Sequence, residues 1–299
     1  MELRQLSHFV AVAEEGNFSV AARRVHLSQP ALTRSIRNLE DHLETRLLDR
    51  TPQGAALTQS GELFLDYARM ILNDCSRARE GIRLFREGAV GQVHIGIAAM
   101  FGGWIADEVV QRATLELPNL ELTVTEGYFE DLLSLLRSSK LDFLLTNFAQ
   151  PGVDDEFVFE PTLQLRALIF AAADHPLTRV ERIEPADLAA AAWVVVDRAH
   201  AVDMLAPLFA GVQLAAPRPL RTNSLALIRS LVANGSHLTL VSDAVMHRDL
   251  QRGHVRALNV PMPVLTRQAG LIYMRDRPRA QAVERMMQIV RQTSAARAR

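Results

Sequence analysis

A pair of short amphipathic helices joined by a tight turn constrains the fold of this chain more than any other feature. The pair lies in FSVAARRVHLSQPALTRSIRNLEDHL, residues 18–43. Its second helix is predicted to begin at Ser28, a good N-cap, with Pro30 in the first turn, where a missing N–H group costs nothing. Apolar side chains then recur at spacings of 4, 3 and 4 and predict one buried stripe, formed by Leu32, Ile36, Leu39 and Leu43.

Residues 1–58 as a whole are predicted to form three helices and a hairpin. Apolar residues of the first helix recur at helical spacing until Gly16 and Asn17 end it. The second helix is expected to begin at a Ser19 cap. The segment DRTPQGA is rich in turn-forming residues and predicts a small hairpin, or wing, after the third helix.

Residues 59–90 carry the signature of a long pairing helix followed by a hinge at Gly88. Its apolar residues follow a strict heptad, and a stripe this narrow suits a partner helix better than a globular core. We therefore expect two chains to dimerise along it. The residues of the expected seam are Phe64, Ala68, Ile71, Cys75, Ala78, Ile82 and Phe85.

From residue 92 onward, short β-rich runs alternate with helical stretches. Such alternation predicts parallel α/β sheets with ligand sites at the strand ends, and there is enough chain for two subdomains. The expected strands are 93–97, 121–125, 142–146, 165–172, 193–197, 238–242 and 269–274. The expected helices include 106–116, 129–138, 224–233 and 278–296.

Composition narrows the class of protein. A chain of 299 residues is too long for one ordinary core, so two or three domains are expected. The N-terminus carries acids where an export signal needs a basic start and an apolar run, so we expect a cytoplasmic protein that spans no membrane. The net charge of −1 excludes a globally basic nucleic-acid binder, and any DNA contact must be local.

A helix, a tight turn and a second helix with an exposed polar N-terminal half match the layout of a helix-turn-helix, whose second helix enters the major groove. Gln29 can bond base edges, Thr33 a thymine methyl group or phosphate, and Arg34 guanine or phosphate. The alternative is a solvated helix face, because residues 1–58 hold seven Arg and seven acids and form no basic block. The complete predicted DNA-binding set is Ser28, Gln29, Pro30, Thr33, Arg34, Arg37, Asn38 and, in the wing, Arg50.

The N-terminal segment from residue 2 to about 72, with SQPALTRSIRNLE at its centre, is similar to the same region of LysR-type transcriptional regulators. LPNLELTVTEG, LRSSKLDFLLTN and LVANGSHLTLVSDAV resemble the family more loosely. The resemblance implies a mixed fold of three parts: an all-α winged helix-turn-helix domain at 1–58, a linker and dimerisation helix at 59–90, and an α/β effector domain at 91–299. That last domain would resemble a periplasmic binding protein, with lobe 1 at about 91–162 and 267–299 and lobe 2 at about 163–266.

The resemblance also implies partners. It implies double-stranded DNA carrying an interrupted inverted repeat, bound by a homodimer or by a homotetramer that bends the promoter, and it is compatible with contact to RNA polymerase. A small-molecule effector would bind between the lobes. Strand ends that lead into helix N-termini favour anions, so a small carboxylate or an aromatic acid is expected. The effector contacts carried over by position are Ala99, Met100, Phe101, Tyr128, Thr146, Asn147, His200 and Asn223.

The chain departs from the family pattern at several positions. Gln53 stands where the wing commonly has a basic residue, which weakens phosphate anchoring. Ser242 replaces a usual proline, and the first effector strand leads to Ala98 and Ala99 where a Ser or Thr is usual. The last two departures argue against transferring the effector chemistry of any one family member.

Other constellations point to no further chemistry. Cys75 is expected to be a core thiol, because sensing peroxide through a disulfide would need a second cysteine. The histidines have no metal-ligand spacing, and the chain lacks a P-loop, a GxGxxG after a strand and a nucleophile motif. We therefore expect no cofactor, no metal and no enzymatic activity. A solute-binding receptor and an α/β enzyme are the alternatives from other classes.

Overall fold

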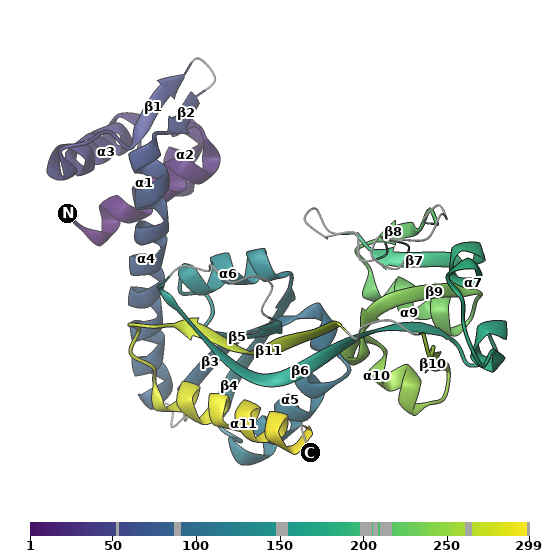
Figure 1. The fold of residues 1–299 in the computed structure, drawn as a ribbon. Coiled ribbons are helices and arrows are strands. Elements are labelled where there is room, and N and C mark those ends of the chain that lie inside the picture. The colour runs from purple at the N-terminus through teal and green to yellow at the C-terminus, as the bar shows by residue number, and fades with distance from the viewer. Residues whose placement is uncertain are drawn as a thin grey trace. The chain divides into compact units, whose positions relative to one another are not determined.

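The computed structural model places the chain in two compact units (Figure 1). It describes residues 1–51, 54–86, 91–147, 155–197, 205, 209, 217–260 and 265–297. One unit comprises Met1–His94 with Asn119–Thr123 and Leu133–Asp142, and the other comprises Ile95–Pro118, Val124–Leu132 and Phe143–Arg299. Among the described residues, no helix combines the length and apolarity needed to cross a membrane.

The N-terminal part consists of three helices and a two-stranded hairpin, as the sequence predicted. The elements are α1 (Leu3–Glu15), α2 (Phe18–Arg24), α3 (Gln29–Leu43), β1 (Leu48–Thr51) and β2 (Gly54–Leu57). Leu6, Phe9 and Val12 of α1 pack with Leu32, Ile36 and Leu39 of α3 in one core. The spacing of these residues therefore decides which face of α3 is buried.

The helix caps explain where these helices begin. Ser28 caps α3 as predicted, and its Oγ accepts a hydrogen bond from the N–H of Ala31 at 3.4 Å. The expected cap at Ser19 was wrong, because α2 is capped by Asn17. The Asn17 Oδ1 accepts from the N–H groups of Ser19 at 2.8 Å and Val20 at 3.2 Å, so Ser19 lies inside the first turn.

The long helix α4 (Gln59–Arg86) follows the hairpin, as the heptad predicted. Its first half packs on its own N-terminal domain: Ala68 is fully buried there, Phe64 and Ile71 border the same core, and the rings of Phe9 and Phe64 lie 5.5 Å apart. Ala78 and Ile82, further along the same stripe, are exposed. The heptad thus combines residues that serve the domain core with residues that have no intrachain partner surface.

The remaining chain forms a mixed sheet with helices, and Figure 1 shows β6 and β11 running side by side along its length. The strands are β3 (Gly91–Ala98), β4 (Leu120–Gly127), β5 (Phe143–Asn147), β6 (Phe157–Ala172), β7 (Ala192–Val196), β8 (Leu220–Thr222), β9 (His237–Ser242), β10 (Val255–Ala257) and β11 (Leu265–Met274). The helices are η1 (Ala99–Phe101), α5 (Ile105–Glu116), α6 (Phe129–Arg137), η2 (Pro176–Arg179), α7 (Pro185–Ala190), α9 (Leu225–Ala233), α10 (Asp243–Gln251) and α11 (Gln281–Arg297).

The sheet corrects the expectation of purely parallel strands. Its order is β4-β3-β5-β11-β6-β9-β7-β8, with β10 paired to β6. The pairs β3–β5, β7–β9 and β7–β8 are parallel, whereas β6 and β11 are antiparallel to each other and to their other neighbours. The reason is that β6 and β11 carry the chain in opposite directions between two groups of parallel strands.

The β6–β11 pair contains an irregularity where close backbone contact requires glycine. The register shifts between Ala269 and Gly270. A Cβ atom on Gly270 would lie 2.1 Å from the backbone oxygen of Glu160, which is too close for any side chain. The sequence did not reveal the first half of β6, because Glu160 and Pro161 interrupt its apolar pattern.

Candidate nucleic-acid interface

Helix α3 presents two faces of opposite character. Leu32 and Leu39 are fully buried and Ile36 nearly so. Every predicted DNA-binding side chain that the structure describes lies on the other side: Thr33 is half-buried, and the exposed ones are Ser28, Gln29, Pro30, Arg34, Arg37 and Asn38. The face of α3 that could enter a major groove is therefore polar, and its opposite face is fixed to the domain.

The two arginines on the exposed face of α3 have no intramolecular counter-charge. Within the described part of the chain, neither Arg34 nor Arg37 forms an ion pair, whereas Arg24 on α2 is paired with Glu14 at 2.8 Å and Glu15 at 2.9 Å. A guanidinium free of an acid can contact phosphate or guanine without first breaking a salt bridge. The free cations and the polar groups share the N-terminal two-thirds of α3.

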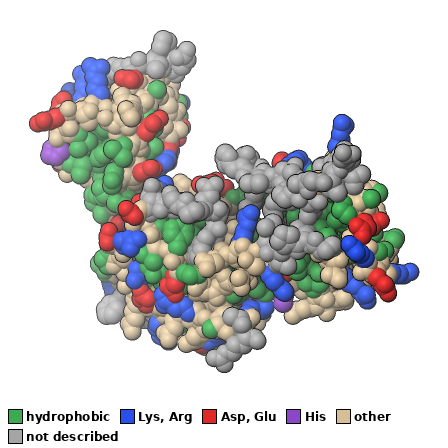
Figure 2. All heavy atoms as spheres, viewed as in Figure 1, with side chains coloured by type: hydrophobic (Ala, Val, Ile, Leu, Met, Phe, Trp, Pro, Cys, Tyr) green, Lys and Arg blue, Asp and Glu red, His purple; other side chains and the backbone are tan. Residues whose placement is uncertain are grey.

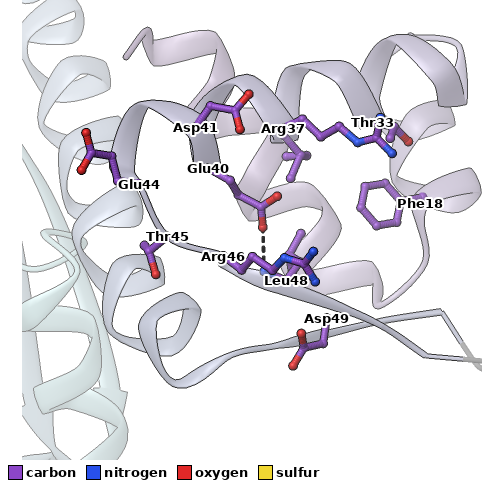
Figure 3. Close-up of a pocket in the computed structure, with 11 residues that line it drawn as sticks. Phe18, Thr33, Arg37, Glu40, Asp41, Glu44, Thr45, Arg46, Leu48 and Asp49 are labelled. Carbon is purple, nitrogen blue, oxygen red and sulfur yellow. Dashed lines mark hydrogen bonds between the residues drawn. The ribbon is translucent and has the colours of Figure 1, made fainter.

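Acidic residues mark the C-terminal end of α3 and bound a concave surface between this helix and β1 (Figure 3). Thr33, Arg37 and Phe18 line one end, and the lining residues further along include Asp41, Glu44, Thr45, Arg46 and Asp49. Figure 2 shows that basic and acidic side chains of this domain gather at different places on its surface. The basic end of α3 therefore suits DNA phosphates better than the acidic end does.

The wing is held close to the rest of the domain by its glycine. In the hairpin, Arg50 pairs with Ala55, and the N–H of Ala55 donates to the backbone oxygen of Gly16 at 2.7 Å. A Cβ atom on Gly54, whose φ is +143°, would lie 2.1 Å from that same oxygen. The β1 backbone thus places Arg50 beside α3, while its side chain lies outside the described part of the structure.

Histidine 8 connects α1 to the exposed helix. Its ring is 8% exposed, and Nδ1 lies 2.7 Å from the Oγ of Ser35, the neighbour of Arg34. Burial, assisted by the positive charge of Arg4, lowers the pKa of His8 below its ordinary value. The sequence had given His8 only a general packing role, because nothing in a single histidine indicates which side chain it will meet.

The lowered pKa of His8 leads to a pH prediction. As pH falls, the unfolded chain binds the proton first, so this group lowers the free energy of unfolding from about pH 6.5 downward. The expected result is a thermal midpoint for the N-terminal domain that drops between about pH 7 and pH 5.5, and drops less in His8→Gln. Calorimetric scans across this range measure both, and parallel curves for the two proteins would contradict the assignment.

The predicted effector residues are only partly brought together. Tyr128 and Asn223 meet, since the Tyr128 hydroxyl donates to the backbone oxygen of Asn223 at 2.5 Å. Phe101 is fully buried and stacks on Trp104 with ring centroids 5.7 Å apart, while Met100 packs against the apolar cluster around Phe170.

The other predicted effector residues are covered or outside the description. Ala99 is half-buried at the start of η1. In β5, Thr146 is fully buried and Asn147 is 4% exposed. His200 lies outside the described residues. In this arrangement, neither β5 side chain offers its polar atoms to an open surface.

The predicted dimer seam is divided by exposure. Phe64, Ala68 and Ile71 pack on the N-terminal core, Cys75 is half-buried, and Ala78 and Ile82 are exposed. The side chain of Phe85 lies outside the described part. Among residues outside the heptad, Leu63 is 66% and Tyr67 is 53% exposed. They are i and i+4 on α4, and Figure 2 shows an apolar area where this helix adjoins the N-terminal domain.

The described residues offer no group of three or more His, Cys, Asp or Glu side chains that could hold a metal ion. Cys75 is a free thiol.

Two family models cover the chain. The description "Bacterial regulatory helix-turn-helix protein, lysR family" matches residues 3–62, and "LysR substrate binding domain" matches residues 86–295. The first match contains α1 to β2, and the second contains every strand of the large sheet.

Relatives match over nearly their full length. The DNA-binding transcriptional dual regulator OxyR of Escherichia coli K12 is 30% identical over 294 residues, which cover 97% of this chain and 95% of that protein. The hydrogen peroxide-inducible genes activator of Pectobacterium carotovorum is also 30% identical, with 98% of this chain and 96% of that protein covered. The crystal structure of full-length CbnR with its target DNA has the same fold, with a TM-score of 0.68 at 20% identity, and the alignment covers 98% of this chain and 100% of CbnR.

Proposed function

This chain belongs to the LysR family of bacterial transcription regulators, and from that premise we propose that α3 reads operator DNA while the wing holds a neighbouring phosphate. The proposed contacts are the predicted set Ser28, Gln29, Pro30, Thr33, Arg34, Arg37, Asn38 and Arg50. Two copies of α3 in a dimer would meet successive major grooves, about 34 Å apart, on an interrupted inverted repeat. The site of action would be the cytoplasm, and the names of the relatives support regulation rather than catalysis.

One observation carries this proposal: the exposed face of α3 holds two arginines without counter-charges, on a helix whose opposite face is anchored by Leu32 and Leu39. A merely solvated face would be expected to pair Arg34 or Arg37 with the acids further along the same helix. The description of the E. coli relative as a DNA-binding regulator supports the same reading.

Fluorescence anisotropy tests the proposal directly. The purified chain is titrated against duplex DNA from its own upstream intergenic region and against a scrambled duplex, at several salt concentrations. We expect tighter binding to the native duplex and a steep loss of affinity with salt, because each neutralised phosphate releases counterions. Equal, weak binding to the native duplex and to genomic fragments, with and without effectors, would contradict it.

For the domain boundaries we propose 1–58, 59–90 and 91–299, as the sequence predicted. The contacts of α4 add one detail. Arg77 forms an ion pair with the buried carboxylate of Asp142, which also accepts from the N–H of His94 at 2.7 Å. Asn73 donates to the backbone oxygen of Ser138. These contacts tie the linker helix to the segment between α6 and β5, and a change in that segment would reach α4.

The effector is proposed to be a small carboxylate, with an aromatic acid preferred. Helix N-termini attract anions, but α5, α6 and α10 already carry acids in their first turns: Asp107 and Glu108, Glu130 and Asp131, and Asp243. Helix α9 has none, and its N-terminus adjoins Asn223, which Tyr128 contacts. We therefore place the carboxylate there, with the ring near Tyr128 and Met100.

The effector proposal predicts a charge requirement. Benzoate and larger aromatic acids are expected to bind and to change DNA affinity, whereas benzamide, which has no charge, is expected to do neither. Tyr128→Phe, which lacks the hydroxyl, should bind the acids more weakly. Isothermal titration calorimetry measures the affinities, and binding of benzamide equal to that of benzoate would overturn the placement.

Effector binding is proposed to act by shifting the angle between the lobes, a population shift that requires the effector to prefer one arrangement. Contacts that such a rotation must change are present. Arg248 of α10 forms an ion pair with Asp107 of α5, and Arg297 lies 5.6 Å from the Trp104 ring centroid and 3.0 Å from Glu108.

Peroxide sensing through an intrachain disulfide is excluded by composition, although some relatives are named for peroxide. The chain has one cysteine, Cys75. We predict that hydrogen peroxide leaves the anisotropy curve unchanged and that Cys75→Ser binds DNA like the parent protein. A peroxide-dependent change in DNA binding that disappears in Cys75→Ser would contradict this expectation and point to bonding between chains.

A further inference from the structure

Glutamate 40 occupies an unusual position for an acid near a DNA-binding surface. It belongs to α3, and its Oε1 accepts hydrogen bonds from two successive backbone N–H groups, those of Leu47 at 2.8 Å and Leu48 at 3.1 Å. Figure 3 shows the carboxylate reaching from the helix across the concave surface to the start of β1. One side chain thus joins the exposed helix to the first strand of the wing.

The backbone around Leu47 is fixed on its other sides as well. Leu47 and Leu48 are 1% and 7% exposed, and the backbone oxygen of Leu47 accepts from the N–H of Thr58 at 3.0 Å. Between α3 and β1 the chain turns through Glu44, whose φ is +52°, a conformation that favours Gly or Asn over Glu. The Glu40 bonds close this turn from the inside.

We infer that Glu40 is a positioning residue for DNA recognition, which sets the place of the wing strand relative to α3. The inference rests on the proposed function of these two elements. Arg50 lies two residues after Leu48 on β1, so a shift at Leu48 displaces the strand that carries the proposed phosphate contact. Base contacts from α3 and the phosphate contact from the wing can form together only if this spacing is kept.

Charge and position make opposite predictions for this residue. A carboxylate near DNA repels phosphate, so its removal should raise affinity if charge alone mattered. Asp41, which lines the same concave surface, provides the matched control because no hydrogen bond ties it to the wing. Removal of Glu40 should instead lower affinity, because the two N–H groups lose their acceptor and the wing is released.

The experiment measures operator affinity and its salt dependence for Glu40→Ala, Glu40→Gln, Glu40→Asp and Asp41→Ala in the full chain. We expect Glu40→Ala to weaken binding at least about fivefold, in line with the loss of hydrogen bonds to a charged group. The slope of log K against log salt should fall by about 0.9, the value for one lost phosphate contact. Asp41→Ala should bind as well as the parent or better.

The two conservative variants separate position from charge and from folding. Glu40→Gln loses the charge but keeps an acceptor, so it should bind at least as well as the parent. Glu40→Asp keeps the charge but is one methylene shorter, so it should behave like Glu40→Ala. In combination with Arg50→Ala, Glu40→Ala should cost little further affinity, because the wing contact is already absent.

Parent-like affinity in both Glu40→Ala and Glu40→Asp would overturn the inference, and so would equal weakening by Asp41→Ala. Additive losses in Glu40→Ala with Arg50→Ala would also overturn it, because they indicate general destabilisation. Failure of the parent chain itself to prefer its operator would instead overturn the proposed function.

Discussion

Arg34→Ala is expected to abolish specific operator binding while leaving the fold and the dimer intact. Arg34 is exposed on α3, and no ion pair holds it within the described part of the chain. A bidentate contact to guanine contributes about 1–3 kcal/mol of discrimination, so a dimer with two such contacts loses about 2–6 kcal/mol. That loss corresponds to a weakening of at least ~30-fold, measured by anisotropy on the native duplex.

The matched control is Arg79→Ala on α4, which removes the same charge from an exposed position outside α3. It should bind the operator nearly as the parent does. Circular dichroism and light scattering should show the same helix content and mass for both variants. Normal operator binding by Arg34→Ala would show that α3 does not read DNA through this residue, and equal losses in the two variants would show only a nonspecific charge effect.

The sequence predicted the helix-turn-helix well because its information is local. The stripe of Leu32, Ile36 and Leu39 has the period of a helix, and Ser28 with Pro30 marks its start, so the buried and exposed faces of α3 follow without knowledge of the rest. The hairpin follows from its turn residues for the same reason. The cap of α2 was misassigned by two residues, because Asn17 and Ser19 are both good caps and only the backbone geometry distinguishes them.

Features that depend on contacts distant in sequence were not predictable. Nothing local indicates that Glu40 reaches Leu47, that His8 meets Ser35, or that Arg77 pairs with Asp142. The effector region failed for a related reason. Position along the chain indicated that Thr146 follows a strand end, but not that β11 would pair beside it and help bury it.

The heptad of α4 shows both outcomes in one element. Its period correctly predicted a long helix with one apolar stripe, but the period cannot say which surface covers each residue. Phe64, Ala68 and Ile71 are covered by the N-terminal core of the same chain, whereas Ile82 is 65% exposed. Substitution of Ile71 by Glu would therefore disturb folding and dimerisation together, and Ile82 is the better position for testing the seam.

Ile82→Glu is expected to convert the dimer into a monomer of 33.2 kDa. In a single chain the new carboxylate would be solvated, because Ile82 is 65% exposed, and such surface changes alter stability little. Across a two-fold seam it would place two unpaired acids in an apolar interface, where each buried charge carries a penalty of several kcal/mol. Multi-angle light scattering at several concentrations measures the mass. Val180→Glu provides the control, because Val180 is 41% exposed and lies outside α4.

The loss of the dimer should in turn reduce operator affinity although α3 is unchanged. A dimer gains from the high effective concentration of its second α3, a gain of roughly 10²-fold or more when both half-sites are engaged. Ile82→Glu should therefore bind a full operator little better than a half-site, whereas the parent protein distinguishes the two strongly. An unchanged mass would count against the seam at Ile82. A monomer that still prefers the full operator would show that the DNA itself brings two chains together.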